Sequence, residues 1–151
     1  VEEEKIDKIL RAAMQAPSAV NQQPWEFIVV RKKELLDKLS NMSPYSKMLA
    51  SAPLALVLLG NYDRMKAKEY WQQDMGAAAQ NILLEATELG LGAVWLGVAP
   101  QKEREDYIKE LFQLPGNIVP FCVISIGYPL KDQENKFIDR YDESRVHYDR
   151  Y

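Results

Sequence analysis

Cysteine and histidine are almost missing from the sequence of 151 residues, which has one of each, Cys122 and His147. A single cysteine rules out an intramolecular disulfide, a CxxC redox pair and a cysteine-rich zinc site, and a single histidine removes most other zinc geometries. Metal chemistry is therefore close to excluded. Cys122 lies in an apolar stretch, and we expect it to be an unreactive buried thiol.

An excess of positive charge and a long apolar run are missing too. The chain has 19 Lys and Arg against 22 Asp and Glu, a net charge of −3 at pH 7, so it lacks the general attraction to phosphate of nucleic-acid-binding proteins. The longest apolar run, residues 52–60, is about half the length of a membrane span, and the acidic start at residues 1–4 is unlike a signal peptide. We expect a cytoplasmic protein with neither a nucleic-acid nor a membrane partner.

The common catalytic motifs are absent as well. No GxSxG surrounds Ser18, and the only histidine lies in a charged tail, which argues against a Ser-His-Asp triad. Gly90, Gly92 and Gly97 follow a predicted helix instead of a strand, and Trp95 occupies the third glycine position of GxGxxG, so a Rossmann site is rejected. No GxxxxGK[ST] phosphate loop occurs.

The apolar spacing predicts a single domain of helices and strands. With 47% hydrophobic and 27% charged residues, the chain has the composition of an ordinary folded protein. Apolar residues recur at helical intervals over residues 2–16, 33–41, 69–89 and 102–112. Apolar runs, mostly β-branched and aromatic, predict strands over 25–30, 53–59, 93–98 and 119–126. The strand at 53–59 is apolar at nearly every position, so we expect it at the centre of the sheet.

Two segments are expected to need cover from a second chain. The small residues 76–79 remove bulk from one face of the long helix, which then ends at Gly90 and Leu91 in a pattern typical of a Schellman motif. Eleven of the last 22 residues are charged, so this tail cannot build a core of its own. Its aromatic residues predict contact with a partner subunit; they are Phe137, Tyr141, Tyr148 and Tyr151.

The polar loop between the first helix and the first strand, residues 16–25, is unusual. Its sequence APSAVNQQPW carries a hydroxyl and three side-chain amides between two prolines. Such neutral groups both donate and accept hydrogen bonds, which suits a uracil-like edge or a ribityl chain. The residues alone favour a simpler alternative, a helix-stopping turn whose Asn and Gln side chains bond to the local backbone.

The stretch APSAVNQQPWEFIVV, residues 16–30, resembles the APSxxNxQPW motif of the nitroreductase family of FMN enzymes. Residues 74–84 resemble the long dimer helix of that family, residues 89–97 its next strand and residues 126–129 its last core strand, all in the expected order. The resemblance implies an α+β fold in which helices flank a mainly antiparallel sheet of four or five strands. It also implies an intertwined homodimer with two FMN sites at the interface, each chain forming one domain over residues 1–151.

The resemblance also assigns site residues. Pro17, Ser18 and Asn21 would line the flavin, with Gln23 nearby, and the backbone of Leu96 and Gly97 would meet the flavin N5/O4 edge. Arg140, with Lys136, would lie against the phosphate, as a guanidinium suits; the alternative for Arg140 is a solvated charge beside Asp139 and Asp142. Family members usually carry an Arg-rich phosphate-binding segment before the first helix, and we expect it to be absent from a chain that starts at Val1.

The function implied by the resemblance is reduction of nitroaromatics, quinones or similar acceptors with NAD(P)H by a ping-pong route. The flavin carries the redox chemistry, so no catalytic side chain is expected. The alternatives are a specialised flavin enzyme of the same fold, such as a dehydrogenase or a flavin-fragmenting enzyme, and a non-catalytic flavin-binding protein. Gln80 and Asn81 are as well explained by hydrogen bonds of the long helix as by flavin contact.

Overall fold

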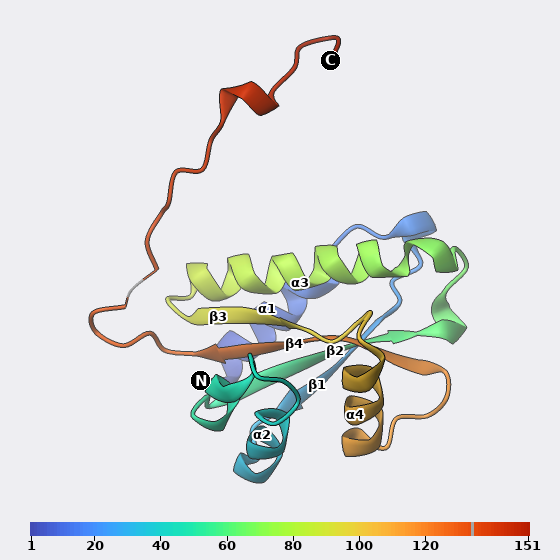
Figure 1. Cartoon of the computed structure of the whole chain (residues 1–151), viewed down its shortest axis with the longest axis vertical. Coiled ribbons are helices and arrows are strands. Elements are labelled where there is room, and N and C mark those ends of the chain that lie inside the picture. Colours follow the sequence, from blue (N-terminus) through green and yellow to red (C-terminus); the bar gives the residue numbers. More distant parts are fainter. Residues whose placement is uncertain (134) are drawn as a thin grey trace.

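The computed structural model describes residues 1–133 and 135–151, and at its centre lies a four-stranded antiparallel sheet (Figure 1). The order is β1-β2-β4-β3, and the strands are β1 (Trp25–Val30), β2 (Leu54–Asn61), β3 (Gly92–Gly97) and β4 (Ile118–Gly127). The four predicted strands are therefore confirmed. β2 lies inside the sheet and is buried from Leu54 to Gly60, as its apolar run predicted.

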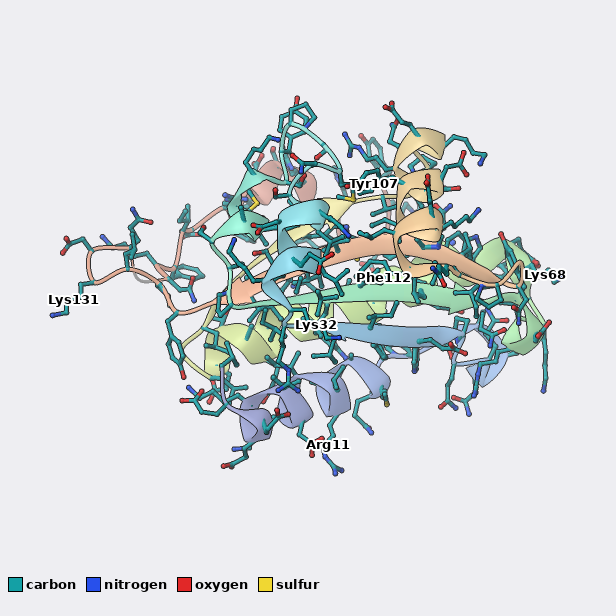
Figure 2. All side chains as sticks on the ribbon, turned by 90° about the horizontal axis from the view of Figure 1, so that it is seen from below. Arg11, Lys32, Lys68, Tyr107, Phe112 and Lys131 are labelled. Atoms are coloured by element: carbon teal, nitrogen blue, oxygen red, sulfur yellow. The ribbon has the colours of Figure 1, made fainter. Side chains whose placement is uncertain are left out.

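Helices cover both faces of this sheet. One face carries α1 (Glu3–Met14) and α3 (Trp71–Glu88), and the other carries α2 (Lys33–Leu39) and α4 (Lys102–Phe112). Figure 2 shows α1 on the opposite side of the sheet from α2 and α4. The predicted α+β class is confirmed. Within the described ranges, no helix is both long and apolar enough to cross a bilayer.

The strand β2 contributes to two separate cores. Because successive side chains of a strand point to opposite faces, the even-numbered residues from Leu54 to Leu58 pack under α1 and α3. The odd-numbered residues from Ala55 to Leu59 pack under α2 and α4. This double burial explains why the segment shows no polar alternation.

The long helix α3 ends as its sequence predicts and begins two residues later. Gly90 adopts a φ of +73°, its N–H bonds to the Thr87 carbonyl at 3.0 Å, and the N–H of the buried Leu91 bonds to the Ala86 carbonyl at 2.8 Å. These are the two bonds of a Schellman motif. The start is delayed because Lys68–Tyr70 forms a 3₁₀ turn after Ala67.

The small residues at 76–79 are used largely within the chain. Ala78 and Ala79 are fully buried in the core shared with α1, and Gly76 lies half-buried against Trp95. The expectation that this run lacks cover in one chain is therefore wrong for Ala78 and Ala79. Their small side chains allow α3 to pack closely on α1 and the sheet.

The tail residues that the structure describes build no core of their own, as predicted. After β4 the chain runs away from the body of the molecule (Figure 1), with one 3₁₀ turn at Glu143–Arg145. Phe137 is 92% exposed and Tyr148 is 80% exposed. Near its start, Asn135 Nδ2 donates to the Leu91 carbonyl at 2.9 Å.

Candidate functional site

The polar loop and the end of β3 lie at the same end of the sheet. The loop leads into Trp25, which pairs with Gly60 near the end of β2, and Gly97 at the end of β3 pairs with Cys122 in the first half of β4. The two segments occupy opposite edges, because β2 and β4 lie between β1 and β3. With strands about 4.8 Å apart, the sheet separates them by roughly 14 Å.

The first half of α3 connects these two segments. Asp74 binds the polar loop through both carboxylate oxygens, and Gly76 faces Trp95 of β3. Trp71 and Trp95 both pack edge-on against Phe121, with ring centroids 5.8 and 5.5 Å apart. Trp71 and Trp95 therefore both pack against the core under α1 and α3.

The loop backbone is held in an uncommon conformation. Val20, Asn21 and Gln23 have φ values of 47°, 54° and 47°. Residues other than glycine rarely adopt positive φ, and a β-branched residue such as valine does so at a real cost. Ser18 Oγ accepts the Gln23 N–H at 3.0 Å and closes the loop on itself.

The three amide side chains of the loop take two different roles. Gln22 is buried: its Nε2 donates to Asp74 Oδ2 at 2.6 Å and to the Ala67 carbonyl at 3.1 Å, while its Oε1 accepts the Ala67 N–H at 2.9 Å. Asn21 and Gln23 are exposed, and Gln23 Nε2 donates to Asn21 Oδ1 at 3.1 Å. Gln22 thus anchors the loop to Ala67 and Asp74, 45 and 52 residues away in the sequence, whereas Asn21 and Gln23 face outward.

A cavity of about 350 Å³ lies beside the loop. Its lining comes from the loop and the first turns of α3: Pro17, Ser18, Ala19, Tyr70, Gln73, Asp74 and Ala77. Asp74 is the only charged residue of this lining, and both of its oxygens accept hydrogen bonds from the loop. The cavity therefore suits a neutral, flat or polyhydroxylated group better than an isolated anion.

The end of β3 presents backbone instead of side chains. Leu96 is 6% exposed and packs in the core under α2 and α4, while a Cβ placed on Gly97 would meet no atom within 4 Å. The Gly97 carbonyl accepts a hydrogen bond from Arg104 Nη1 of α4 at 2.8 Å. Burial raises the pKa of the Cys122 thiol, opposite Gly97, far above its ordinary value.

The tail cations lie far from this site within one chain. The tail leaves the sheet at the end where β4 finishes, opposite the polar loop; in Figure 2, Lys131 and Lys68 mark these two ends. Lys136 and Arg140 are exposed on this tail, and Asp142 pairs with Arg145 at 3.1 Å. One chain therefore brings together the loop and α3, but not the loop and the predicted phosphate ligands.

Three residues of the site were missed by the sequence analysis: Gln22, Asp74 and Arg104. Asp74 looks like an acidic residue favoured in the first turn of any helix, and Arg104 is one charge in the run 102–106. Asn81 Nδ2 donates to the Ala12 carbonyl of α1 at 2.9 Å, which gives it a structural role. In residues 1–133 and 135–151, no group of three His, Cys, Asp or Glu side chains could hold a metal ion.

Comparison with known proteins places this architecture in a family. The model of the nitroreductase family matches residues 1–44 and 41–128. A protein of Methanothermobacter thermautotrophicus, provisionally named NADH dehydrogenase/NAD(P)H nitroreductase, is 45% identical over 100% of this chain and 78% of its own.

Solved structures agree with this match. A provisionally named NADH oxidase of Clostridium acetobutylicum is 62% identical, with a TM-score of 0.97 over 100% of this chain and 90% of its own. An FMN-dependent nitroreductase of Clostridium difficile is 38% identical, with a TM-score of 0.89 over 100% of this chain and 90% of its own. The resemblance seen in the sequence is confirmed, and the chain belongs to the nitroreductase family.

Proposed function

We propose that this protein is an FMN-dependent oxidoreductase that uses NAD(P)H to reduce small acceptors such as nitroaromatics or quinones. The observation that carries the proposal is the outward-facing polar loop beside α3, in a chain that is 38% identical along its whole length to an FMN-dependent nitroreductase. A neutral donor and acceptor set of this kind matches the polar edge of a flavin ring.

The residues present fit the ring of FMN. Pro17 and Ser18 line the cavity beside the loop, and the side chains of Asn21 and Gln23 offer exposed amide donors and acceptors. At the other edge of the sheet, Gly97 leaves space for close approach to its backbone. We assign these residues, with the backbone of Leu96, to the flavin ring and ribityl chain.

The phosphate of FMN requires a different part of the molecule. No Lys or Arg is among the residues lining the cavity beside the loop, and the predicted ligands Lys136 and Arg140 lie on the extended tail. We therefore propose a homodimer in which the tail of one chain covers the site of the other. The exposed aromatic residues of the tail support this arrangement, because isolated chains rarely leave so much aromatic surface uncovered.

When bound, FMN supplies the two-electron redox chemistry that links NAD(P)H to the acceptor. The side chains of this protein bind and orient: the amides of Asn21 and Gln23 match polar ring atoms, and Ala77 and Tyr70 supply walls that displace water. Asp74, the one acidic group of the cavity, is occupied with the loop. No side chain at this site is therefore assigned as an acid or a base. In this proposal, residues 1–151 act as one FMN-binding domain.

Absorbance spectroscopy tests the proposal directly. The purified full chain, mixed with FMN and passed through gel filtration, is expected to retain a yellow chromophore that NADH or NADPH bleaches without oxygen and that a nitroaromatic or quinone restores. Retention without bleaching would favour a specialised flavin enzyme or a flavin-binding protein. A chain that neither retains FMN nor oxidises NAD(P)H would overturn the proposal.

A further inference from the structure

The carboxylate of Asp74 is an unusual group in this structure. It lies in the first turn of α3, and the residue is only 4% exposed. Among the residues that the structure describes, no ion pair includes Asp74. A buried carboxylate without a cation is costly unless hydrogen bonds satisfy it. For Asp74, the two hydrogen bonds from the polar loop provide this compensation.

Those two bonds reach both sides of the strained part of the loop. Asp74 Oδ1 accepts the Ala19 N–H at 2.8 Å, and Asp74 Oδ2 accepts Gln22 Nε2 at 2.6 Å. Ala19 and Gln22 flank Val20 and Asn21, which both have positive φ. A single side chain therefore fixes the two ends of the segment that turns Asn21 outward.

Only a carboxylate satisfies both partners. The backbone N–H of Ala19 can only donate. Gln22 cannot turn its amide around, because its Oε1 and Nε2 are fixed by the N–H and carbonyl of Ala67 at 2.9 and 3.1 Å. An asparagine at position 74 would present one acceptor and one donor to two donors, the Ala19 N–H and Gln22 Nε2. One of these two donors would therefore stay unpaired.

We infer that Asp74 is a positioning residue that holds the polar loop in the conformation that binds FMN. It acts through Ala19 and Gln22, and its charge strengthens both hydrogen bonds. The inference rests on the proposed function, because it gives the loop its ligand. Asp74 thus determines the affinity for FMN without contacting the isoalloxazine edge itself.

Asp74→Asn is the test, with Asn81→Ala as a matched control. Asn81→Ala removes an α3 hydrogen bond of similar length, that to the Ala12 carbonyl at 2.9 Å, away from the loop. Titration of the FMN-free full chain with FMN is expected to show a Kd raised roughly 10- to 100-fold in Asp74→Asn, the loss typical of a buried charged hydrogen bond. Asn81→Ala is expected to keep the wild-type Kd.

Hydrogen exchange of the FMN-free protein supplies the readout that a general loss of stability would not give. In Asp74→Asn the amides of residues 19–23 are expected to exchange faster while those of β2 and β4 keep their protection. If Asp74→Asn does not fold, Gln22→Met is measured in its place. It removes the bond to Asp74 Oδ2 from the loop side, together with the two bonds to Ala67, and is expected to raise the Kd for FMN and the exchange of the loop amides in the same direction.

Three results would overturn the inference: a wild-type FMN affinity in Asp74→Asn, unchanged exchange of the loop amides in that variant, or equal weakening of FMN binding in Asn81→Ala. Failure of the proposed function has a different signature. In that case the wild-type chain itself binds no FMN, while the local exchange change in Asp74→Asn still shows whether Asp74 holds the loop.

Discussion

Gly97→Ala tests whether the end of β3 faces the cofactor with its backbone. A Cβ at this position would meet no atom within 4 Å, and Gly97 does not have a positive φ. The alanine is therefore compatible with the fold. Replacing glycine at such a position stabilises a protein by about 0.4–1 kcal/mol, because the unfolded chain loses conformational freedom.

The affinity for FMN is expected to change in the opposite direction. If the flavin edge approaches the Gly97 backbone, the added methyl group occupies space that the ring needs. Overpacking of this kind costs about 1–3 kcal/mol, which is roughly a 5- to 150-fold rise in Kd. Because the two effects have opposite signs, a partly unfolded variant cannot imitate the expected result.

Thermal unfolding of the FMN-free protein and a fluorescence titration with FMN measure the two quantities. Gly116→Ala is the control: it adds the same methyl group where nothing lies within 4 Å, between α4 and β4. It is expected to leave the Kd unchanged. If Gly97→Ala binds FMN as tightly as Gly116→Ala does, the flavin edge does not approach the Gly97 backbone closely.

Four further outcomes are expected. Asn21→Ala removes a side chain that both donates and accepts hydrogen bonds, and titration is expected to show FMN binding weakened by about 1–3 kcal/mol, or roughly 5- to 150-fold. Ser18→Ala is expected to weaken it less, because water replaces a hydroxyl easily. An unchanged Kd in Asn21→Ala would make Asn21 a turn residue only. Arg140→Ala is expected to weaken FMN more than riboflavin, because only FMN carries the phosphate, and an equal loss for both flavins would assign Arg140 to the fold or the dimer. Light scattering is expected to give a dimer of the 17.4 kDa chain that deletion of residues 130–151 weakens; a full chain that is stably monomeric at micromolar concentration would contradict the proposed homodimer. Cys122 is expected to react with a thiol reagent only after unfolding, because burial both raises the pKa of the thiol and closes access to it, and rapid labelling of the folded protein would contradict this.

Elements whose signals are local could be predicted from the sequence. The Gly90-Leu91 pair marks the end of α3 because a left-handed glycine and a buried apolar residue are neighbours in the chain. The continuous apolar run of β2 identified an inner strand because both of its faces meet a core. The start of α3 was predicted two residues early, because the 3₁₀ turn at Lys68–Tyr70 follows Ala67, whose peptide is bonded to Gln22, 45 residues earlier.

From residue types and spacing alone, apart from the family resemblance, the candidate site could be predicted only as a segment. The sequence identifies residues 16–25 as unusual, but Asn21, Gln22 and Gln23 are nearly equivalent there. What separates the buried Gln22 from its exposed neighbours is the position of Asp74, 52 residues away. Likewise, no pattern within the charged run 102–106 distinguishes Arg104, which alone reaches the Gly97 carbonyl. Contacts of this kind depend on how helices dock on the sheet.

The separation, within one chain, of the polar loop from the proposed phosphate ligands would have a thermodynamic consequence. The loop and Gly97 lie at one end of the sheet, and the tail that carries Lys136 and Arg140 leaves from the other. If the tail of a second copy supplies the phosphate ligands, every FMN contact to that tail exists only in the dimer. FMN then binds the dimer more tightly than the single chain, and by linkage it must stabilise the dimer by the same factor. Riboflavin, which lacks the phosphate, shares the ring contacts with FMN but loses the part of this coupling that Arg140 provides.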